Sequence, residues 1–364
     1  MSMLLGLFTE LNAPGGIQRA GRHIAAVLKA YAEQNTLPWC FLSLNDSEGF
    51  HTIQINHVKI VFQGFARKKS RFIREAFRAL KCQPWLVWCG HVNMAPIAAI
   101  KQKVSSTTWM IVATHGIEVW NSLPFWKRYA LQIADYVTTP SEITTHCVHK
   151  VQNVPKSRIW SIPWGLEYLP NESILTSESS APVLLTVARL AACERYKGID
   201  HVIQVLPRIL RVVPEVEYWI IGDGDDRPRL VALARQMGVG NRVRFLGYVS
   251  EEQLHDCYRR CTVLTMPSRG EGFGFVYLEA MAYGKPVVAG AHGGPLDFIQ
   301  DRVNGFVVQY GNLDQLTEVL IAVLTNPRLR QRVGQNARET VLSRYTFAHF
   351  RARIFELLDR LRSW

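Results

Sequence analysis

The sequence predicts an α/β protein built from two doubly wound Rossmann-like domains, and three observations predict it. Short apolar runs alternate with amphipathic, helix-like stretches in both halves of the chain. Several of these runs are continuously apolar, as in strands buried on both faces of a parallel sheet. The chain of 364 residues is too long for one compact core, and the Ser- and Pro-containing segment 170–182 separates its halves.

The first half predicts a strand at Leu4–Phe8 and a helix over Gln18–Tyr31. The apolar start is short, lacks a basic flank and is soon followed by Glu10, so we interpret it as a strand and not as a signal peptide. Further strands are expected at Trp85–Cys89, Trp109–Thr114, Tyr136–Thr139 and Arg158–Ile162.

The second half repeats the alternation more regularly. Strands are predicted at 183–190, 217–224, 243–249, 262–268, 286–290 and 305–308, and helices at 198–213, 227–237, 250–259 and 276–283. We therefore expect a first domain at 1–169, a linker at 170–182, a second domain at 183–345 and a closing helix at 346–364. In doubly wound domains ligands bind beyond the carboxyl ends of the strands, so functional residues should directly follow strands.

The net charge of +12 is concentrated in two segments, 67–81 and 328–364, which carry +6 each, while the remainder is neutral. This distribution argues against a nucleic-acid binder with a broad basic surface. Segment 67–81 has the pattern of a helix with one apolar face, and two interpretations stay open. The helix lies on an anionic membrane or acceptor, or its apolar face packs on the sheet while its charges are solvated. Its basic residues are Arg67, Lys68, Lys69, Arg71, Arg74, Arg78 and Lys81.

Other classes are excluded by composition. No apolar run approaches the roughly 18 residues of a membrane-spanning helix. The seven cysteines are odd in number and form no C-x-x-C pair, which argues against a disulfide framework and favours a reducing cytosol. Two small clusters, His146–His149 and His255–Cys261, lack a full ligand set at zinc spacing, so no metal is expected.

The most informative segment is Arg269–Ala280, in which three glycines precede a helix that begins near Phe275. Glycines permit close backbone approach, and a helix N-terminus favours an anion such as phosphate. Glu271 in the loop and Glu279 in the helix are separated by seven residues, so both can border one pocket. Because carboxylates repel phosphate, we expect them to accept hydrogen bonds from sugar hydroxyls; the alternative is a glycosidase-like acid–nucleophile pair.

Two basic residues after the strand at 183–190 form a second motif. Arg189 and Lys197 could hold a diphosphate, although a solvated or salt-bridged pair is the alternative. Gly222-x-Gly224 also follows a strand, but Arg227 stands where a dinucleotide fingerprint needs its third glycine, which argues against a nicotinamide enzyme. The acidic run 223–226 is interpreted as a strand end, a turn and a helix cap.

Together these motifs resemble the retaining, GT-B-fold glycosyltransferases of glycosyltransferase family 4, the glycosyl transferases group 1. Glu271 and Glu279 are similar to that family's E-x7-E signature, and Arg189 with Lys197-Gly198 resembles its R…K-G element. The likeness covers nearly all of 183–345. In the first half Pro14–Arg19 and Thr114–Gly116 resemble its glycine loop and His-Gly element. Ile162–Gly165 resembles its Pro-Asn-Gly pattern, with Trp164 in place of Asn.

The resemblance implies a role for each residue. Glu271 and His115 would contact the transferred sugar as catalytic residues, and Glu279 would bind the donor ribose. The donor diphosphate would be held by Gly15, Gly16, Arg189, Lys197, Gly272, Phe273, Gly274 and Phe275. The first domain would bind the acceptor and the second the nucleotide sugar, across a cleft, with the closing helix packing on the first domain.

The resemblance further implies a retaining, metal-independent hexosyltransferase without a cofactor. It would move mannose or glucose from a GDP- or UDP-hexose to a lipid-linked or polysaccharide acceptor in polysaccharide biosynthesis, with no nucleic-acid partner. We expect it in the cytoplasm, peripheral on the inner face of the cytoplasmic membrane. The alternative is a non-transferring protein of this fold, either a nucleotide-sugar epimerase or a catalytically silent sugar- or membrane-binding adaptor.

Overall fold

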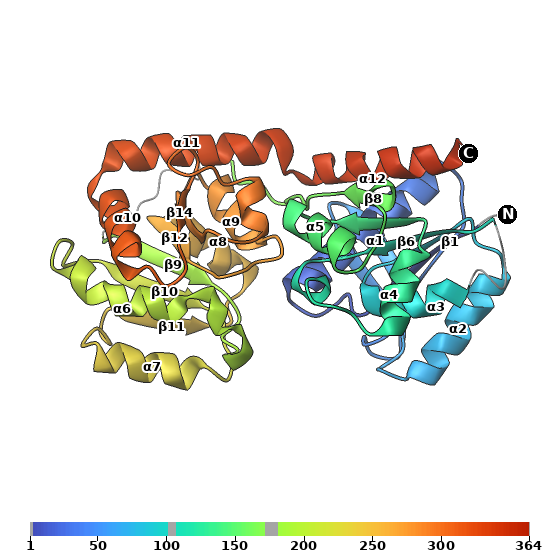
Figure 1. The fold of residues 1–364 in the computed structure, drawn as a ribbon, viewed down its shortest axis with the longest axis horizontal. Helices are drawn as coiled ribbons and strands as arrows, with labels where there is room; N and C mark the ends of the chain where they lie inside the picture. Colours follow the sequence, from blue (N-terminus) through green and yellow to red (C-terminus); the bar gives the residue numbers. More distant parts are fainter. Residues whose placement is uncertain (1–2, 101–106, 172–180, 364) are drawn as a thin grey trace. The chain divides into compact units, whose positions relative to one another are not determined.

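The computed structural model describes residues 3–100, 107–171 and 181–363. The chain forms two compact units: Met1–Glu167 together with Phe347–Trp364, and Tyr168–Thr346. Each unit contains a sheet of mainly parallel strands connected by helices (Figure 1). The predicted fold class of two doubly wound α/β domains is thus confirmed, and most of the expected linker 170–182 lies outside the described residues.

The first unit contains an eight-stranded sheet in the order β3-β4-β2-β1-β5-β6-β7-β8. Its elements are β1 (Leu4–Phe8), α1 (Gly16–Gln34), β2 (Trp39–Ser43), β3 (Gly49–Ile55), β4 (Val58–Gly64), α2 (Lys69–Lys81), β5 (Leu86–Cys89), η1 (Val92–Met94), α3 (Ala95–Ala98), β6 (Trp109–Ala113), η3 (Ile117–Val119), α4 (Phe125–Gln132), β7 (Tyr136–Thr139), α5 (Glu142–Lys150), η4 (Lys156–Arg158) and β8 (Ile159–Ser161). Strands β5 to β8 correspond to the four strands that the sequence predicts after residue 80. Each of their ends lies within one residue of the predicted end.

One antiparallel pair, β3–β4, was not predicted. The edge strand β3 alternates between partly buried and exposed residues, and β4 alternates between exposed or partly buried residues and the buried Ile60 and Phe62, so both lack the continuous apolar signal of the central strands. The turn between them uses Asn56 and His57 with φ of 45° and 67°, the left-handed conformation that a two-residue hairpin requires.

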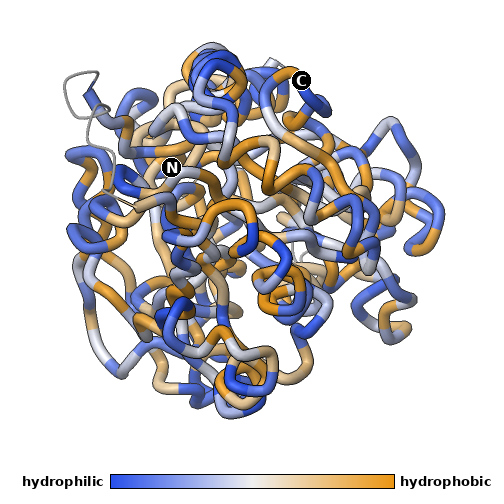
Figure 2. Tube along the Cα trace, turned by 90° about the vertical axis from the view of Figure 1, so that its left-hand side faces the viewer, coloured by the Kyte–Doolittle hydropathy of each residue, from blue (hydrophilic) through white to orange (hydrophobic). Residues whose placement is uncertain are grey.

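The second unit contains a six-stranded parallel sheet in the order β11-β10-β9-β12-β13-β14. Its elements are β9 (Val183–Val187), η6 (Ala192–Lys197), α6 (Ile199–Leu210), β10 (Glu217–Ile221), α7 (Arg227–Gln236), β11 (Val243–Gly247), α8 (Glu251–Arg260), β12 (Val263–Met266), α9 (Phe275–Ala282), β13 (Val287–Gly290), η7 (Gly294–Asp297), β14 (Phe306–Val308), α10 (Leu313–Thr325) and α11 (Pro327–Arg344). Figure 2 shows blue and orange alternating along the outer helices, the pattern of helices with one buried face.

The closing helix α12 (Phe347–Arg362) belongs to the first unit, although it follows the second unit in the chain. It buries Phe350, Ile354, Leu357, Leu358 and Leu361. The hydroxyl of Tyr31 on α1 donates to Asp359 Oδ1 over 2.8 Å, and the Phe347 amide donates to the Leu166 carbonyl over 2.8 Å. The expected return of the C-terminal helix to the N-terminal domain is confirmed.

Candidate functional site

Three loops follow the strands of the second unit, and hydrogen bonds join them into one surface. Arg189 and η6 follow β9, the glycine loop 267–274 follows β12, and Gly293 and Gly294 follow β13. The Arg269 amide donates to the Tyr196 carbonyl over 2.7 Å, which joins the first two loops. The Gly294 amide donates to the Glu271 carbonyl over 2.7 Å, which joins the last two. The residues predicted in this half therefore lie together at the carboxyl edge of the sheet.

The glycine loop ends at the start of α9. Gly274 occupies the N-cap with φ of 93°, and a Cβ there would lie 2.6 Å from Cδ2 of Tyr277, so a side chain does not fit. Because the cap has no side chain, the positive end of the helix is presented at the loop. Burial raises the pKa of Glu271, and the nearby charge of Lys197 partly opposes this rise.

Arg189 and Lys197 are brought together by Glu194, which sequence reasoning did not assign. Glu194 Oε2 lies 2.7 Å from Lys197 Nζ, and Glu194 Oε1 accepts a hydrogen bond from Arg189. Burial favours the neutral form of Glu194, but hydrogen bonds from Arg189 and Lys197 outweigh it and keep its pKa below the ordinary value. Arg189 stays 65% exposed, so its guanidinium can still reach an anion from solvent.

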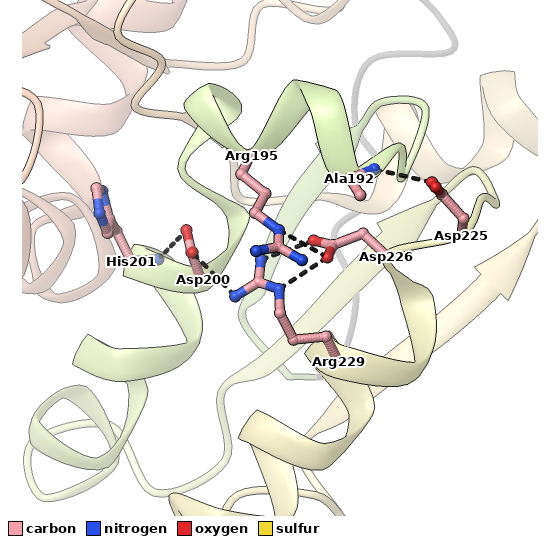
Figure 3. A network of polar contacts seen from close by, with 7 residues as sticks. All are labelled: Ala192, Arg195, Asp200, His201, Asp225, Asp226 and Arg229. Carbon is pink, nitrogen blue, oxygen red and sulfur yellow. Dashed lines mark hydrogen bonds and ion pairs between the residues drawn. The ribbon is translucent and has the colours of Figure 1, made fainter.

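A network of ion pairs fixes η6 to the start of α7 (Figure 3). Asp226 accepts hydrogen bonds from Arg195 over 3.0 Å and from Arg229 over 2.6 and 2.8 Å. Arg229 also reaches Asp200 over 3.2 Å, and the Ala192 amide donates to Asp225 over 2.8 Å. Asp226 stands at the N-cap position of α7, where the sequence predicts a helix cap, but its side chain makes no cap hydrogen bond. Its carboxylate instead holds the loop that carries Lys197.

Glu279 lies on α9, about one turn from its start, as predicted. Its Oε2 accepts a hydrogen bond from the Tyr258 hydroxyl of α8 over 2.5 Å. Tyr258 is 1% exposed, so this contact anchors the carboxylate to the unit's interior. A carboxylate held in one orientation is suited to accept bidentate hydrogen bonds from a vicinal diol.

Gly293 and Gly294 were missed by sequence reasoning. A Cβ on Gly293 would lie 2.6 Å from both N and O of Glu271, and one on Gly294 would lie 2.3 Å from the carbonyl oxygen of Gly272. These two positions must be glycine for the glycine loop to keep its place. The available signal was two adjacent glycines directly after a predicted strand, at the end that carries ligands.

In the first unit, Gly15, Gly16 and His115 each follow a strand of its own sheet. Gly15 has φ of 136° and stands at the N-cap of α1, which Gly16 begins. The His115 ring is 8% exposed, and its Nε2–H donates to the Gly90 carbonyl over 2.7 Å. In the described part of the chain Nδ1 has no hydrogen-bond partner. Burial lowers the pKa of His115, so the ring is neutral and Nδ1 is an acceptor.

Two aromatic residues that sequence reasoning did not assign to the site stack on His115. The rings of His91 and Trp164 both stack on the His115 ring, each with its centroid 5.5 Å from that of His115, at interplanar angles of 20° and 12°. Trp164 in turn packs on Phe350 of α12 at 5.3 Å. The tryptophan that replaces the expected asparagine thus contacts the predicted catalytic histidine itself.

The basic segment 67–81 forms α2, whose apolar face is buried. Phe72, Ala76 and Leu80 belong to the core cluster under the sheet, which favours the packing interpretation for this face. Lys68 and Arg71 both pair with Glu48, and Arg78 pairs with Glu75 over 3.3 Å. The remaining basic residues form no ion pair within the described residues: Arg67, Lys69, Arg74 and Lys81.

In the described part of the chain no group of three or more His, Cys, Asp or Glu residues is arranged to hold a metal ion. In the middle of α8, His255 hydrogen-bonds the Tyr283 hydroxyl over 2.9 Å and packs on Tyr168 at 4.2 Å. Cys257 and Cys261 are buried.

Within residues 3–100, 107–171 and 181–363, the helices are all too short or too polar to cross a bilayer.

The chain is similar in sequence to a known protein family and to several of its members. Residues 171–340 match the family model described as glycosyl transferases group 1. The chain is 30% identical over 293 residues to the GDP-mannose-dependent alpha-(1-6)-phosphatidylinositol monomannoside mannosyltransferase of Mycolicibacterium smegmatis, covering 75% of this chain and 76% of that protein. It is 31% identical over 172 residues to the lipopolysaccharide core biosynthesis glycosyltransferase LpsE of Rhizobium meliloti, covering 47% of this chain and 48% of that protein.

Solved structures with the same fold cover nearly the whole chain. The sucrose-phosphate synthase of Thermosynechococcus elongatus matches with a TM-score of 0.79 at 19% identity, covering 100% of both chains. Anabaena HepE in complex with UDP and glucose matches with a TM-score of 0.74 at 19% identity, covering 98% of this chain and 99% of that one.

Proposed function

The chain belongs to the glycosyl transferases group 1 family and has the GT-B fold, and from this premise we propose that it is a retaining, metal-independent hexosyltransferase. The donor is a nucleotide-diphosphate sugar, and the acceptor is a lipid-linked sugar or a polysaccharide. The observation that carries the proposal is the cluster in which Glu194 pairs with Arg189 and Lys197, and the charge of Lys197 acts on Glu271 in the loop before α9.

The chemistry follows from the charges in this cluster. When the glycosidic bond of the donor breaks, negative charge develops on the departing diphosphate. Arg189 and Lys197 together with the α9 N-terminus can stabilise that charge without a metal ion. Glu194 already holds both cations in one place, so the diphosphate enters an organised pair of positive charges.

The sugar and the ribose are assigned to three further residues. Glu271 accepts hydrogen bonds from the hydroxyls of the donor sugar, and Glu279 from those of the ribose. His115 contributes a neutral Nδ1 that can accept a hydroxyl proton of the transferred sugar, and Gly15 and Gly16 let the backbone of the first unit approach the diphosphate. GDP-mannose is the first donor to test, because relatives that match 75% of this chain are GDP-mannose-dependent.

Lys197→Ala and Glu271→Ala should each lower kcat/KM by about 100-fold, since Lys197→Ala removes a contact to the departing diphosphate and Glu271→Ala removes a contact to the transferred sugar, and both groups change charge in the transition state. Arg211→Ala, an exposed basic residue at the end of α6, serves as the control. The assay measures hexose transfer from GDP-mannose and UDP-glucose to lipid extracts, in EDTA, with the anomeric configuration of the product read by NMR.

The proposed activity requires an α-linked product that forms in EDTA only when an acceptor is present. Release of a free sugar or an epimer without acceptor would instead identify an epimerase. Binding of a nucleotide sugar with no turnover would identify a silent adaptor. Wild-type rates in both site variants would show that the catalytic cluster lies elsewhere.

A further inference from the structure

Helix α4 exposes three aromatic side chains on one face. Phe125, Trp126 and Tyr129 are 72%, 61% and 48% exposed, and the rings of Phe125 and Tyr129 stack at 6.1 Å. The three positions are spaced i, i+1 and i+4, so they share one side of the helix. The opposite side is anchored, because Ala130 and Leu131 belong to the core cluster of the first unit.

The charge of α4 is entirely positive. The helix contains Lys127 and Arg128 and no acidic residue. Lys127 donates to the amide oxygen of Asn93 over 2.6 Å, and Arg128 donates to the hydroxyl of Ser122 over 3.3 Å. Both partners are neutral, so within the described residues the two positive charges of α4 are not compensated by an ion pair.

The same layer of helices carries the excess charge of α2. Phe72, Ala76 and Leu80 of α2 contribute to the same core cluster as Ala130 and Leu131 of α4, so the two helices cover one face of the sheet (Figure 1). The apolar side of α2 is buried, and of its larger apolar residues only Ile73 reaches 37% exposure. This layer therefore offers positive charge on α2 and exposed aromatic rings on α4.

We propose that α4 is a membrane-docking element, which inserts Phe125, Trp126 and Tyr129 into the headgroup region of an anionic bilayer. Lys127 and Arg128 bind the anionic headgroups, and the basic residues of α2 add long-range attraction without insertion. Tyr and Trp prefer the boundary between water and lipid because one end of each ring system is polar. Basic residues next to them favour an anionic lipid surface over a zwitterionic one.

A bilayer fits this surface better than a protein partner. A stable protein interface buries about 800 Å² on each side around a packed centre, whereas here three rings on a short helix are flanked by the two cations Lys127 and Arg128. Docking through α4 places the first unit, which the family resemblance assigns to the acceptor, at the lipid surface. The inference goes beyond the proposed transfer activity, because binding to vesicles needs no turnover.

The test is sedimentation of the full chain with two kinds of vesicles, phosphatidylcholine alone and phosphatidylcholine mixed with phosphatidylglycerol. The triple variant F125S/W126S/Y129S should weaken binding to the mixed vesicles by at least about tenfold, since each ring contributes buried apolar area. The control is Phe50→Ser, which removes a 77% exposed ring from β3 of the same unit. Thermal unfolding and nucleotide binding of each variant verify that the fold is retained.

A second variant separates insertion from attraction. R67Q/K69Q/R74Q/K81Q removes four charges of segment 67–81 that form no ion pair within the described residues, and it should lower binding mainly at low salt while leaving the contribution of the rings. Equal binding by the triple aromatic variant and the wild type would overturn the role of α4 and leave α2 as the docking element. Failure of the wild-type chain to bind either kind of vesicle would contradict membrane docking. Self-association that the triple variant abolishes would instead identify the α4 surface as a protein interface.

Discussion

At the residue scale, the candidate site depends on backbone positions that exclude a side chain. Gly274, Gly293 and Gly294 lie where a Cβ would meet atoms of the site's own loops at 2.3–2.6 Å. Two of these contacts, at Gly293 and Gly294, hold the backbone of Glu271 and Gly272 in place. The sequence shows glycines near the ends of strands, but it does not show at which of them a side chain would clash, because that depends on what packs against each glycine in three dimensions.

Gly274→Ala should lower the affinity for the donor nucleotide by at least about tenfold, because the added methyl must displace the Tyr277 ring and shift the start of α9. Gly311→Ala is a matched control: its φ of 81° imposes a similar backbone strain, but no atom lies within 4 Å of the added Cβ. Isothermal titration calorimetry with GDP and UDP measures both. Equal affinities for the two variants would show that the α9 start does not bind the nucleotide.

At the scale of elements, α12 contributes to the core of a unit that is far from it in sequence. Phe350 is fully buried and contacts Trp164 at 5.3 Å and His23 at 6.0 Å. Trp164 also stacks on His115, so the Trp164 ring contacts both Phe350 and the histidine. The packing of the closing helix is therefore connected to the position of the predicted catalytic histidine.

Phe350→Ala should lower the free energy of unfolding by about 3–5 kcal/mol, the usual loss when a buried phenylalanine leaves a cavity. Glu356→Ala on the same helix is the control, because an exposed substitution should change stability by only about 0.5 kcal/mol. Urea denaturation measures both values. A loss below about 1 kcal/mol in Phe350→Ala would mean that the first unit does not need α12 for its stability.

At the scale of the whole molecule, the stability of the first unit depends on histidines that fold in their neutral form. Burial, and then the charge of His115 and of Lys127, lowers the pKa of His91 from 6.5 to about 3. Burial also lowers the pKa of His23 and of His115. Below pH 6.5 the unfolded chain therefore binds protons that the native chain does not, and the stabilisation present above this pH is lost as the pH falls.

The free energy of unfolding should thus decrease between pH 7 and 5, at about 1.4 kcal/mol per pH unit for each such histidine once the unfolded form is fully charged. His91→Gln should lower that slope by about 1 kcal/mol per pH unit. The control substitution is His146→Gln at an exposed position of α5. Urea titrations across this pH range measure how the free energy of unfolding depends on pH. An unchanged slope in His91→Gln would refute the neutral, buried state of His91.

The fold class and most strands of the central sheets follow from the sequence, because strands buried on both faces need continuous apolar runs. The grouping of Arg189, Lys197 and Glu271 also follows, since parallel strands bring their carboxyl ends to one edge. The β3–β4 hairpin could not be predicted in the same way, because an edge strand with one exposed face carries a weaker apolar signal.

The sequence by itself determined the family, the two doubly wound units and the residue types of the candidate site, because these depend on local periodicity and on short motifs. Tertiary structure alone decided which partners those residues have. It showed that Glu194 bridges the two cations, that Trp164 stacks on His115, and that the apolar face of α2 is buried while the rings of α4 are exposed. Burial and pairing are set by segments distant in sequence, so no local pattern records them.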